Sequence, residues 1–319
     1  MPSLRSASDP GAQLARVLRA LRAESDLPFR LAALHGADLR ALLLEVVARR
    51  AAARTPADLL RRYELSPQLH PSAVVPADLR KLEAAALARL PDGFTEVTLP
   101  PHAPLGVSSV LGRFSQDRVL STVADTEVVS DSTNVLALEC ARRRRRLVAR
   151  GPEQQVRLAA SHRLLRPRED AHFGLLALCS AGRDSGSFQF ELDALTEHIS
   201  WHLRVIVEYA PQLALTVRLT DLSDGRRRAA LQHDLLEQLA PAWPTVSWRL
   251  DDERQAGRAY YAPACFAIDA DHAGQAPANL VDGGLTDWTA RMLSDRKERL
   301  LISGLGSERL LQLTGGVSQ

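Results

Sequence analysis

Cysteine, signal-like segments and long apolar runs are scarce or missing in this sequence, and each absence excludes a class of protein. Only three cysteines occur among the 319 residues, and they are widely separated. They fit neither a disulfide framework nor a paired-cysteine zinc site, and they favour a reducing compartment. The N-terminus has no apolar core of signal-peptide length, and no run reaches the ~18 apolar residues of a membrane span. We therefore expect a soluble cytoplasmic protein that does not interact with membranes.

A large net charge is lacking as well. The 40 Lys+Arg and 38 Asp+Glu leave +2 at pH 7, so the whole-chain charge gives no argument for binding to nucleic acid. Five consecutive arginines, 142–146, form a local basic run. Consecutive residues point all round a helix, so these side chains cannot all meet one phosphate backbone, and a solvated helix surface is favoured over a phosphate-rich partner.

The first part of the chain predicts only helices. Leucine and valine recur at i, i+3, i+4 and i+7 over residues 14–21 and 39–47, which is typical of amphipathic helices. Thr55 before Pro56 marks a further helix start, since the hydroxyl can accept a free N–H and proline at the first position loses no needed donor. We expect a helical N-terminal extension over residues 1–76 and a core domain over 77–319.

Strands and helices are mixed irregularly in the core domain. Alternating residues 94–99 follow a glycine turn and end at a double proline, which predicts a strand. Further strands are predicted at 156–160, 175–180, 213–219, 246–250, 260–268 and 300–303, with helices at 134–148, 190–208, 227–239 and 286–293. Because no regular strand–helix–strand alternation is present, we expect an α+β fold in which an antiparallel β-sheet is flanked by helices.

Three stretches of this core occur in a suggestive order. They are GFTEVTLPP, the strand–loop–strand VRLAASHRLLRPREDAHFGLLALCSAG, and SGLGSERLL, where a strand broken by glycines leads into a helix. Together they resemble the three signature motifs of class II aminoacyl-tRNA synthetases, and most closely those of histidyl-tRNA synthetase and of the ATP phosphoribosyltransferase regulatory subunit. The resemblance runs over roughly residues 77–315. It implies a site for ATP and Mg²⁺, and a homodimer formed through the first motif.

The second motif implies a phosphate contact. Arg166 occupies the position of the arginine that grips the α-phosphate, and Phe173 that of the aromatic residue that closes the loop. This chemistry is sound, because a guanidinium offers a planar fork to a phosphate and stabilises charge that builds there. The glutamate usual two residues after that arginine is replaced by Arg168, with Glu169 adjacent. The resemblance places both of these residues on the purine side of the nucleotide.

The third motif implies the other end of the same site. Gly304 and Gly306 would let the strand end beneath the adenine, and Arg309, which opens the next helix, would reach the terminal phosphates. A glycine-rich segment alone is a poor signal, but glycines followed by Glu-Arg-Leu-Leu at a strand-to-helix junction are a better one. Arg166 and Arg309 are therefore the predicted catalytic residues.

Two further segments imply where a substrate binds. By resemblance to histidyl enzymes, Asp131 and Thr133 would hold the α-amino group of an amino acid, although both residue types also cap helices and a helix is predicted to begin near residue 134. Tyr260 and Tyr261 match a double-tyrosine substrate strand, and residues 280–293 match the glycine-rich turn and helix that follow it. Successive residues of a strand face opposite sides, so we expect at most one tyrosine to reach the pocket.

Several residues differ from the histidyl-tRNA synthetase pattern, and these differences restrict the expected substrate. Leu175 and Cys179 stand where that family has a substrate-contacting glutamine and glutamate, and Ala256 stands where it has a catalytic arginine, with Arg254 and Arg258 close by. Apolar groups cannot pair with an imidazole, so histidine is not the expected substrate. Since about ten residues follow the third motif's arginine, we expect no anticodon-binding domain and no complete tRNA synthetase.

Other candidate groups have plainer interpretations. His198 and His202 are spaced i, i+4 on a predicted helix, but the sequence shows no third zinc ligand, and we predict no metal site in the protein itself. Cys179 and Cys265 lie in apolar strands and are expected to be buried packing residues, since a reactive thiol needs an electropositive, partly exposed setting.

The sequence thus predicts ATP-dependent activation of a small carboxylate, most simply an amino acid, as an adenylate. Arg166 would neutralise the α-phosphate, Arg309 would hold the γ-phosphate, Asp131 would anchor the amino group, and Mg²⁺ would screen the triphosphate. The alternative is a non-catalytic paralogue that serves as a regulatory or binding subunit for a protein partner. A nucleic-acid-binding relative, with tRNA as the partner, is a third possibility.

Overall fold

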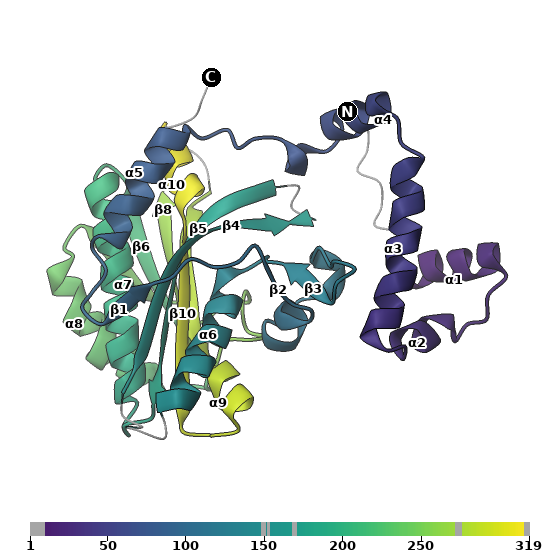
Figure 1. Cartoon of the computed structure of the whole chain (residues 1–319). Coiled ribbons are helices and arrows are strands. Elements are labelled where there is room, and N and C mark those ends of the chain that lie inside the picture. Colours follow the sequence, from purple (N-terminus) through teal and green to yellow (C-terminus); the bar gives the residue numbers. More distant parts are fainter. Residues whose placement is uncertain (1–9, 148–150, 152–153, 168–170, 272–275, 316–319) are drawn as a thin grey trace. The chain divides into compact units, whose positions relative to one another are not determined.

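The computed structural model describes residues 10–147, 151, 154–167, 171–271 and 276–315 (Figure 1). It divides into two compact units. One comprises residues 1–61 with 123–125, and the other comprises residues 62–122 and 126–319. The predicted residues Arg168 and Glu169 lie outside the described residues.

The first unit is helical, with α1 (Pro10–Leu21), α2 (Leu27–Ala32), α3 (Gly36–Ala52) and most of α4 (Pro56–Glu64). The predicted cap at Thr55 is confirmed, because its hydroxyl accepts the Asp58 N–H at 3.2 Å. No side chain of α2, α3 or α4 is buried in the described part of the chain. Large apolar side chains such as Phe29, Leu59 and Leu60 are more than half exposed. These helices therefore lack a core of their own.

The second unit is built on an eight-stranded sheet, in which neighbouring strands follow the order β1-β4-β5-β10-β9-β8-β6-β7. Only the β1–β4 and β6–β7 pairs are parallel, so the predicted antiparallel α+β fold is confirmed. The strands are β1 (Phe94–Glu96), β4 (Val156–Arg166), β5 (Ala171–Arg183), β6 (Ala214–Asp221), β7 (Val246–Leu250), β8 (Ala264–Asp271), β9 (Ala278–Thr286) and β10 (Glu298–Gly306).

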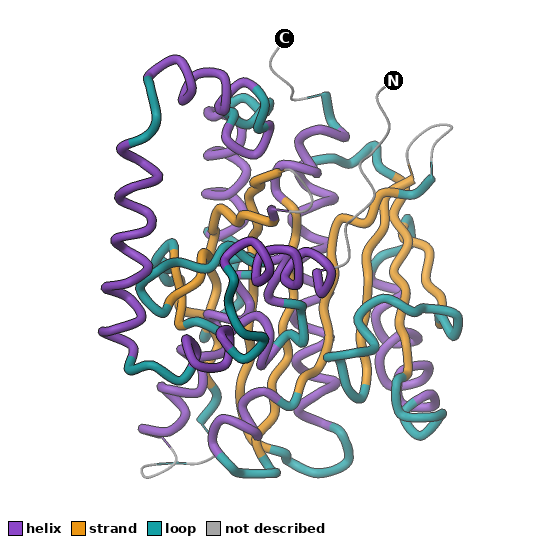
Figure 2. Tube along the Cα trace, turned by 90° about the vertical axis from the view of Figure 1, so that its right-hand side faces the viewer, coloured by secondary structure: helices purple, strands orange, loops and turns teal. Residues whose placement is uncertain are grey.

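Helices cover both faces of this sheet (Figures 1 and 2). The long helix α7 (Gln189–Tyr209) and α5 (Pro76–Leu87) pack on one face, and α6 (Ser132–Leu147) and α9 (Trp288–Leu293) pack on the other. Strand β10 alternates between them, since Leu301 and Leu305 join the α7 side while Leu300 and Ile302 join the α6 side. The shorter elements are β2 (His102–Pro104), β3 (Thr126–Val128), α8 (Glu237–Leu239), α10 (Ser307–Leu313), the 3₁₀ turns Pro67–Leu69, Gln116–Arg118 and Ala240–Ala242, and the π-helical turns Val107–Leu111 and Ala230–Leu236.

The structure corrects several local predictions. Strand β8 begins at Ala264 rather than at residue 260. Residues 280–286, which we interpreted as a glycine-rich turn, belong to β9. There Gly284 is required by packing, because a Cβ would lie 2.6 Å from the Tyr261 ring and 2.7 Å from Cys265. The predicted helix 227–239 is helical over residues 228–239, with a π-helical segment at Ala230–Leu236 followed directly by α8.

The arginine run is only partly on the surface. Arg142 is exposed and pairs with Glu139, as the predicted solvated helix face requires. Arg144, however, is wholly buried and makes two hydrogen bonds, of 2.6 and 2.9 Å, to the equally buried Glu298. Among the described helices, none is both long and apolar enough to cross a membrane.

Candidate functional site

A cleft of about 440 Å³ opens where β5, β9 and β10 lie side by side and α10 begins. Strand β10 pairs with both neighbours, which brings the loop side of the second motif against the glycines of the third. The side chains and glycines that line the cleft are Arg166, His172, Phe173, Leu175, Asn279, Leu280, Asp282, Gly304, Gly306, Glu308, Arg309 and Gln312. The structure therefore brings five of the predicted nucleotide-site residues to one cavity: both arginines, the aromatic residue and the paired glycines.

Three groups fix the orientation of Arg166 at the end of β4. Its Nε donates a hydrogen bond of 3.1 Å to the Ser130 carbonyl. Its guanidinium carbon lies 5.1 Å from the centre of the Phe173 ring, which is a cation–π distance. A terminal nitrogen lies 3.9 Å from Asp131 Oδ2. The side chain is about one-third exposed, so the charged group is positioned by the protein and still faces the cleft.

Arg309 approaches the same cleft from the first turn of α10. One terminal nitrogen donates a 2.7 Å hydrogen bond to the Asn279 carbonyl, which ties the guanidinium to the start of β9. Gly304, on the neighbouring strand β10, leaves room for Leu175, because a Cβ there would lie 3.0 Å from that side chain. A side chain at residue 304 would push Leu175 or fill the cavity.

Asp131 satisfies the capping interpretation of its motif. Its Oδ1 accepts the Thr133 N–H at 2.9 Å and the Thr133 hydroxyl at 2.7 Å, just where α6 begins. Thr133 is buried, and neither residue is among the described residues that line the cleft. The contact to Arg166 still places the second carboxylate oxygen of Asp131 beside the predicted phosphate ligand.

The prediction that the two tyrosines face opposite sides of a strand was wrong. Tyr260 and Tyr261 precede β8, and their ring centres lie 4.3 Å apart. The Tyr261 hydroxyl donates a 3.3 Å hydrogen bond to Asp282, which lines the cleft. Burial raises the pKa of Tyr261 well above its usual value, so its hydroxyl remains a donor at neutral pH.

Sequence reasoning missed Asp282. Arg254 donates to its Oδ1 at 2.5 Å, and the Arg254 side chain is almost fully buried. Burial raises the pKa of Asp282, and the nearby guanidinium of Arg254 opposes that rise. A single acidic residue within the apolar and glycine-rich run LVDGG was the available sequence signal. Arg254 therefore pairs with a carboxylate of the protein rather than with a bound ligand.

A second missed group forms the rim. Glu308 accepts hydrogen bonds from Arg163 and, at 2.6 Å, from Ser72. His172 contacts Arg163 through Nδ1, and its Nε2 lies 2.6 Å from the His70 carbonyl. The segment before α5 is thereby fastened to the cleft. Glu308 directly precedes Arg309 in the sequence, and this adjacency was the available signal that both belong to the rim.

The cleft suits phosphates better than a bare metal ion. Two guanidinium groups border it, whereas its two carboxylates, Asp282 and Glu308, are each held by an arginine. No cluster of three His, Cys, Asp or Glu suited to a metal ion occurs among the described residues.

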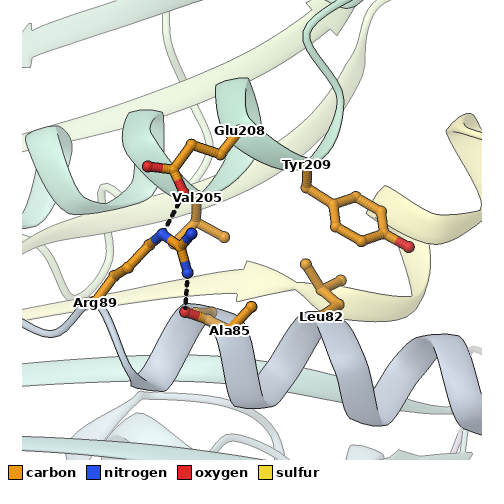
Figure 3. Close-up of a pocket in the computed structure, with 7 residues that line it drawn as sticks. Leu82, Ala85, Arg89, Val205, Glu208 and Tyr209 are labelled. Carbon is orange, nitrogen blue, oxygen red and sulfur yellow. Dashed lines mark hydrogen bonds and ion pairs between the residues drawn. The ribbon is translucent and has the colours of Figure 1, made fainter.

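Two other polar or hollow regions have structural explanations. The groove between α5 and α7 has a volume of about 90 Å³ and is mostly apolar, and Arg89 closes it by pairing with Glu208 and donating to the Ala85 carbonyl (Figure 3). His198 and His202 are fully buried, and both hydrogen-bond to the Ser303 hydroxyl at 2.8 Å. Cys179 and Cys265 are buried in apolar surroundings, which confirms their predicted packing role.

Comparison with known proteins identifies the fold. No protein-family model and no curated protein matches the sequence. Among solved structures, the chain is similar to apo histidyl-tRNA synthetase of S. aureus, with a TM-score of 0.58, 14% identity, and coverage of 78% of this chain and 70% of that one. It is also similar to a histidine–tRNA ligase subunit of Alicyclobacillus acidocaldarius, with a TM-score of 0.56, 14% identity, and coverage of 77% and 97%.

A third similar structure, from Bacillus halodurans, is described as an ATP phosphoribosyltransferase regulatory subunit/histidyl-tRNA synthetase. It has a TM-score of 0.56 and 12% identity, with 77% of this chain and 82% of that one covered. The resemblance inferred from the three motifs is thus confirmed at the level of fold: the chain contains a class II aminoacyl-tRNA synthetase-like core.

Proposed function

From a fold shared with class II aminoacyl-tRNA synthetases, we propose that the chain binds ATP in this cleft and activates a small carboxylate, most simply an amino acid, as an adenylate. The observation that carries the proposal is the placement of Arg166 and Arg309 on one cavity, although they are far apart in the chain. Phe173 and the two glycines border the same cavity, as a flat purine would require.

The chemistry needs no covalent bond to the protein. An oxygen of the substrate carboxylate attacks the α-phosphorus of ATP, a new C–O–P linkage forms, and pyrophosphate leaves as its bond to the α-phosphorus breaks. Mg²⁺ would enter bound to the phosphates and would screen their charge. Arg166 offers charge at the α-phosphate, where negative charge builds, and Arg309 offers it to the departing phosphates. Both guanidinium groups are already oriented by contacts within the protein, so little reorganisation accompanies the reaction.

The residues on the substrate side of the cleft restrict which amino acid can bind. Leu175 lines the cavity where a histidyl enzyme has a polar contact, and the Cys179 thiol is turned to the Thr133 carbonyl at 3.6 Å. Neither group can pair with an imidazole. Asp282 lines the cleft and supplies a carboxylate for an ammonium group, whereas Asp131 contacts Arg166 and is not among the described residues that line the cavity. An amino acid with an apolar side chain fits this arrangement best.

Exchange of pyrophosphate into ATP, dependent on an amino acid and screened over all twenty, tests the proposal. We expect exchange with one or a few small amino acids, and a loss on the order of 10²–10³ for Arg166→Ala or Arg309→Ala. The matched control is Arg80→Ala, since Arg80 is an exposed arginine on α5. If the protein shows neither pyrophosphate exchange nor ATP binding, the proposed adenylate-forming activity is excluded.

A non-catalytic regulatory or binding subunit is the second candidate. The pairing of Asp282 with Arg254 and the apolar Leu175 favour it, because they remove polar groups that catalysis on histidine would need. This form would bind a small amino acid or nucleotide without exchange and pass the signal to a protein partner or a tRNA. Equilibrium dialysis with ATP beside the exchange assay separates the two candidates.

The assembly we propose is a cytoplasmic homodimer through α5 and β1. Strand β1 lies at an edge of the sheet, with its outer side unpaired among the described strands. Sedimentation equilibrium provides the test, with a mass of about twice 34.9 kDa expected.

A further inference from the structure

A second cavity of about 430 Å³ lies at the opposite end of β9 and β10 from the nucleotide cleft. Strand β10 has nine residues, so its two ends are ~25 Å apart at about 3.3 Å per residue. Three apolar residues, Leu285, Leu300 and Pro263, contribute to its lining. Four arginines, Arg227, Arg291, Arg296 and Arg299, contribute to its walls.

Two of these arginines are neutralised by the protein. Arg299 donates to Glu191 at 2.7 Å and to Asp184 at 2.6 Å. Arg291 lies 3.6 Å from Asp287. These pairs form the frame of the cavity and add little net charge to it.

The remaining acidic residue of the lining also has a charged partner within the protein. Glu298 borders the cavity, but its carboxylate accepts both hydrogen bonds from the buried Arg144 described above. A carboxylate held in this way does not offset the charge of the remaining arginines.

Arg227 and Arg296 retain uncompensated charge. Within the described residues, neither guanidinium has a carboxylate within 4.0 Å. Arg227 is nevertheless held in place, because its guanidinium carbon lies 4.6 Å from the centre of the buried Phe188 ring. The lining thus includes two arginines without a carboxylate partner among the described residues, namely Arg227, which Phe188 holds in place, and the exposed Arg296.

We infer that this cavity binds a small organic phosphomonoester. Two guanidinium groups match the two negative charges of such a phosphate, and each planar fork suits its tetrahedral oxygens. The apolar residues of the lining accommodate the organic part. A concave space of this size encloses a small molecule, whereas a nucleic-acid backbone would need an extended basic surface.

This site is separate from the nucleotide cleft and does not depend on the proposed adenylation. The cleft uses Arg166 and Arg309, and the second cavity uses arginines from the segment before the π-helical turn and from the turn before β10. Variants of the two sites can therefore be compared in one folded protein.

Titration calorimetry of the full chain with phenyl phosphate at fixed ionic strength tests the inference, with benzoate as a matched carboxylate probe. We expect one site of saturable binding for phenyl phosphate and weaker binding for benzoate. Arg227→Gln and Arg296→Gln should each weaken phenyl phosphate by about tenfold, the effect of losing a charged hydrogen bond. Arg228→Gln is the matched control, because Arg228 is exposed and pairs with Asp252 outside the cavity.

The same experiment includes Arg309→Ala. If Arg309→Ala binds phenyl phosphate with unchanged affinity, the second cavity is a separate site. If Arg309→Ala loses binding while Arg227→Gln retains it, the probe binds in the nucleotide cleft and the inference is overturned. No saturable binding to the parent protein would overturn it as well. Displacement of the probe by single-stranded RNA with a steep salt dependence would assign the arginines to a nucleic acid instead. Thermal unfolding of each variant, expected to match the parent, shows that the fold is kept.

Discussion

Arg254 and Asp282 form a pair at the cleft, which Asp282 lines, with 2.5 Å between the guanidinium nitrogen and Oδ1. The arginine side chain is only 4% exposed, whereas the aspartate is 36% exposed. A buried charge depends on its partner more than an exposed one does. The pair therefore serves both the fold and the electrostatics of the cleft.

Asp282→Asn should lower the free energy of unfolding by about 2 kcal/mol, because it leaves the Arg254 charge buried beside a neutral amide. The figure is below the usual cost of breaking a buried pair, since solvent reaches the aspartate side. Urea denaturation provides the measurement, with Asp287→Asn as the exposed control. Equal stability of the two variants would show that Arg254 does not need Asp282.

Arg144→Met should destabilise the protein much more than Arg142→Met. The first leaves Glu298 charged and fully buried, which costs about 3–5 kcal/mol. The second removes a surface pair with Glu139, worth at most about 1 kcal/mol. Urea titrations of the two variants compare neighbouring arginines on one helix, and a difference within error would contradict the burial of Arg144.

Stability should fall as the pH drops from 6.5 towards 3. Burial lowers the pKa of His202 to about 3 and also lowers that of His198 well below its usual value. In the unfolded chain both rings take up protons below about pH 6.5, while the folded protein keeps them neutral. Each such ring contributes a slope of up to about 1.4 kcal/mol per pH unit.

The measurement is urea denaturation at several pH values. His202→Gln should reduce that slope, because it removes one of the two fully buried rings. An unaltered slope in His202→Gln would show that this ring is protonated in the folded state.

Gly304→Ala should weaken ATP binding more than it weakens the fold. The added methyl group would lie 3.0 Å from Leu175, so that side chain must shift into the cleft. We expect at least about a tenfold rise in the dissociation constant for ATP, measured by equilibrium dialysis. The control is Gly36→Ala, where a Cβ meets nothing within 4 Å. ATP affinity equal to that of the parent would place the nucleotide elsewhere.

The overall fold was predictable because its signals are local and ordered. Strand β4, its return strand β5, and the glycines at the end of β10 each combine a strand pattern with a turn or a helix start. The order of the three motifs then indicated that Arg166 and Arg309 belong to one site.

What the sequence could not show depends on packing. Gly283 and Gly284 read as a turn because glycine usually marks one, yet in β9 they make room for Phe266 and Tyr261. The sequence could not show that Arg144, within the run of arginines 142–146, is buried, because only the fold brings Glu298 against it. Asp282 gained its importance from Arg254, which lies on a different segment.

Crystals soaked with ATP and Mg²⁺ provide the most direct test of the central claim. We expect nucleotide density in the cleft, with the Arg166 guanidinium at the α-phosphate and the Arg309 guanidinium at the terminal phosphates. Nucleotide bound at another surface, or held in the cleft by neither arginine, would contradict it.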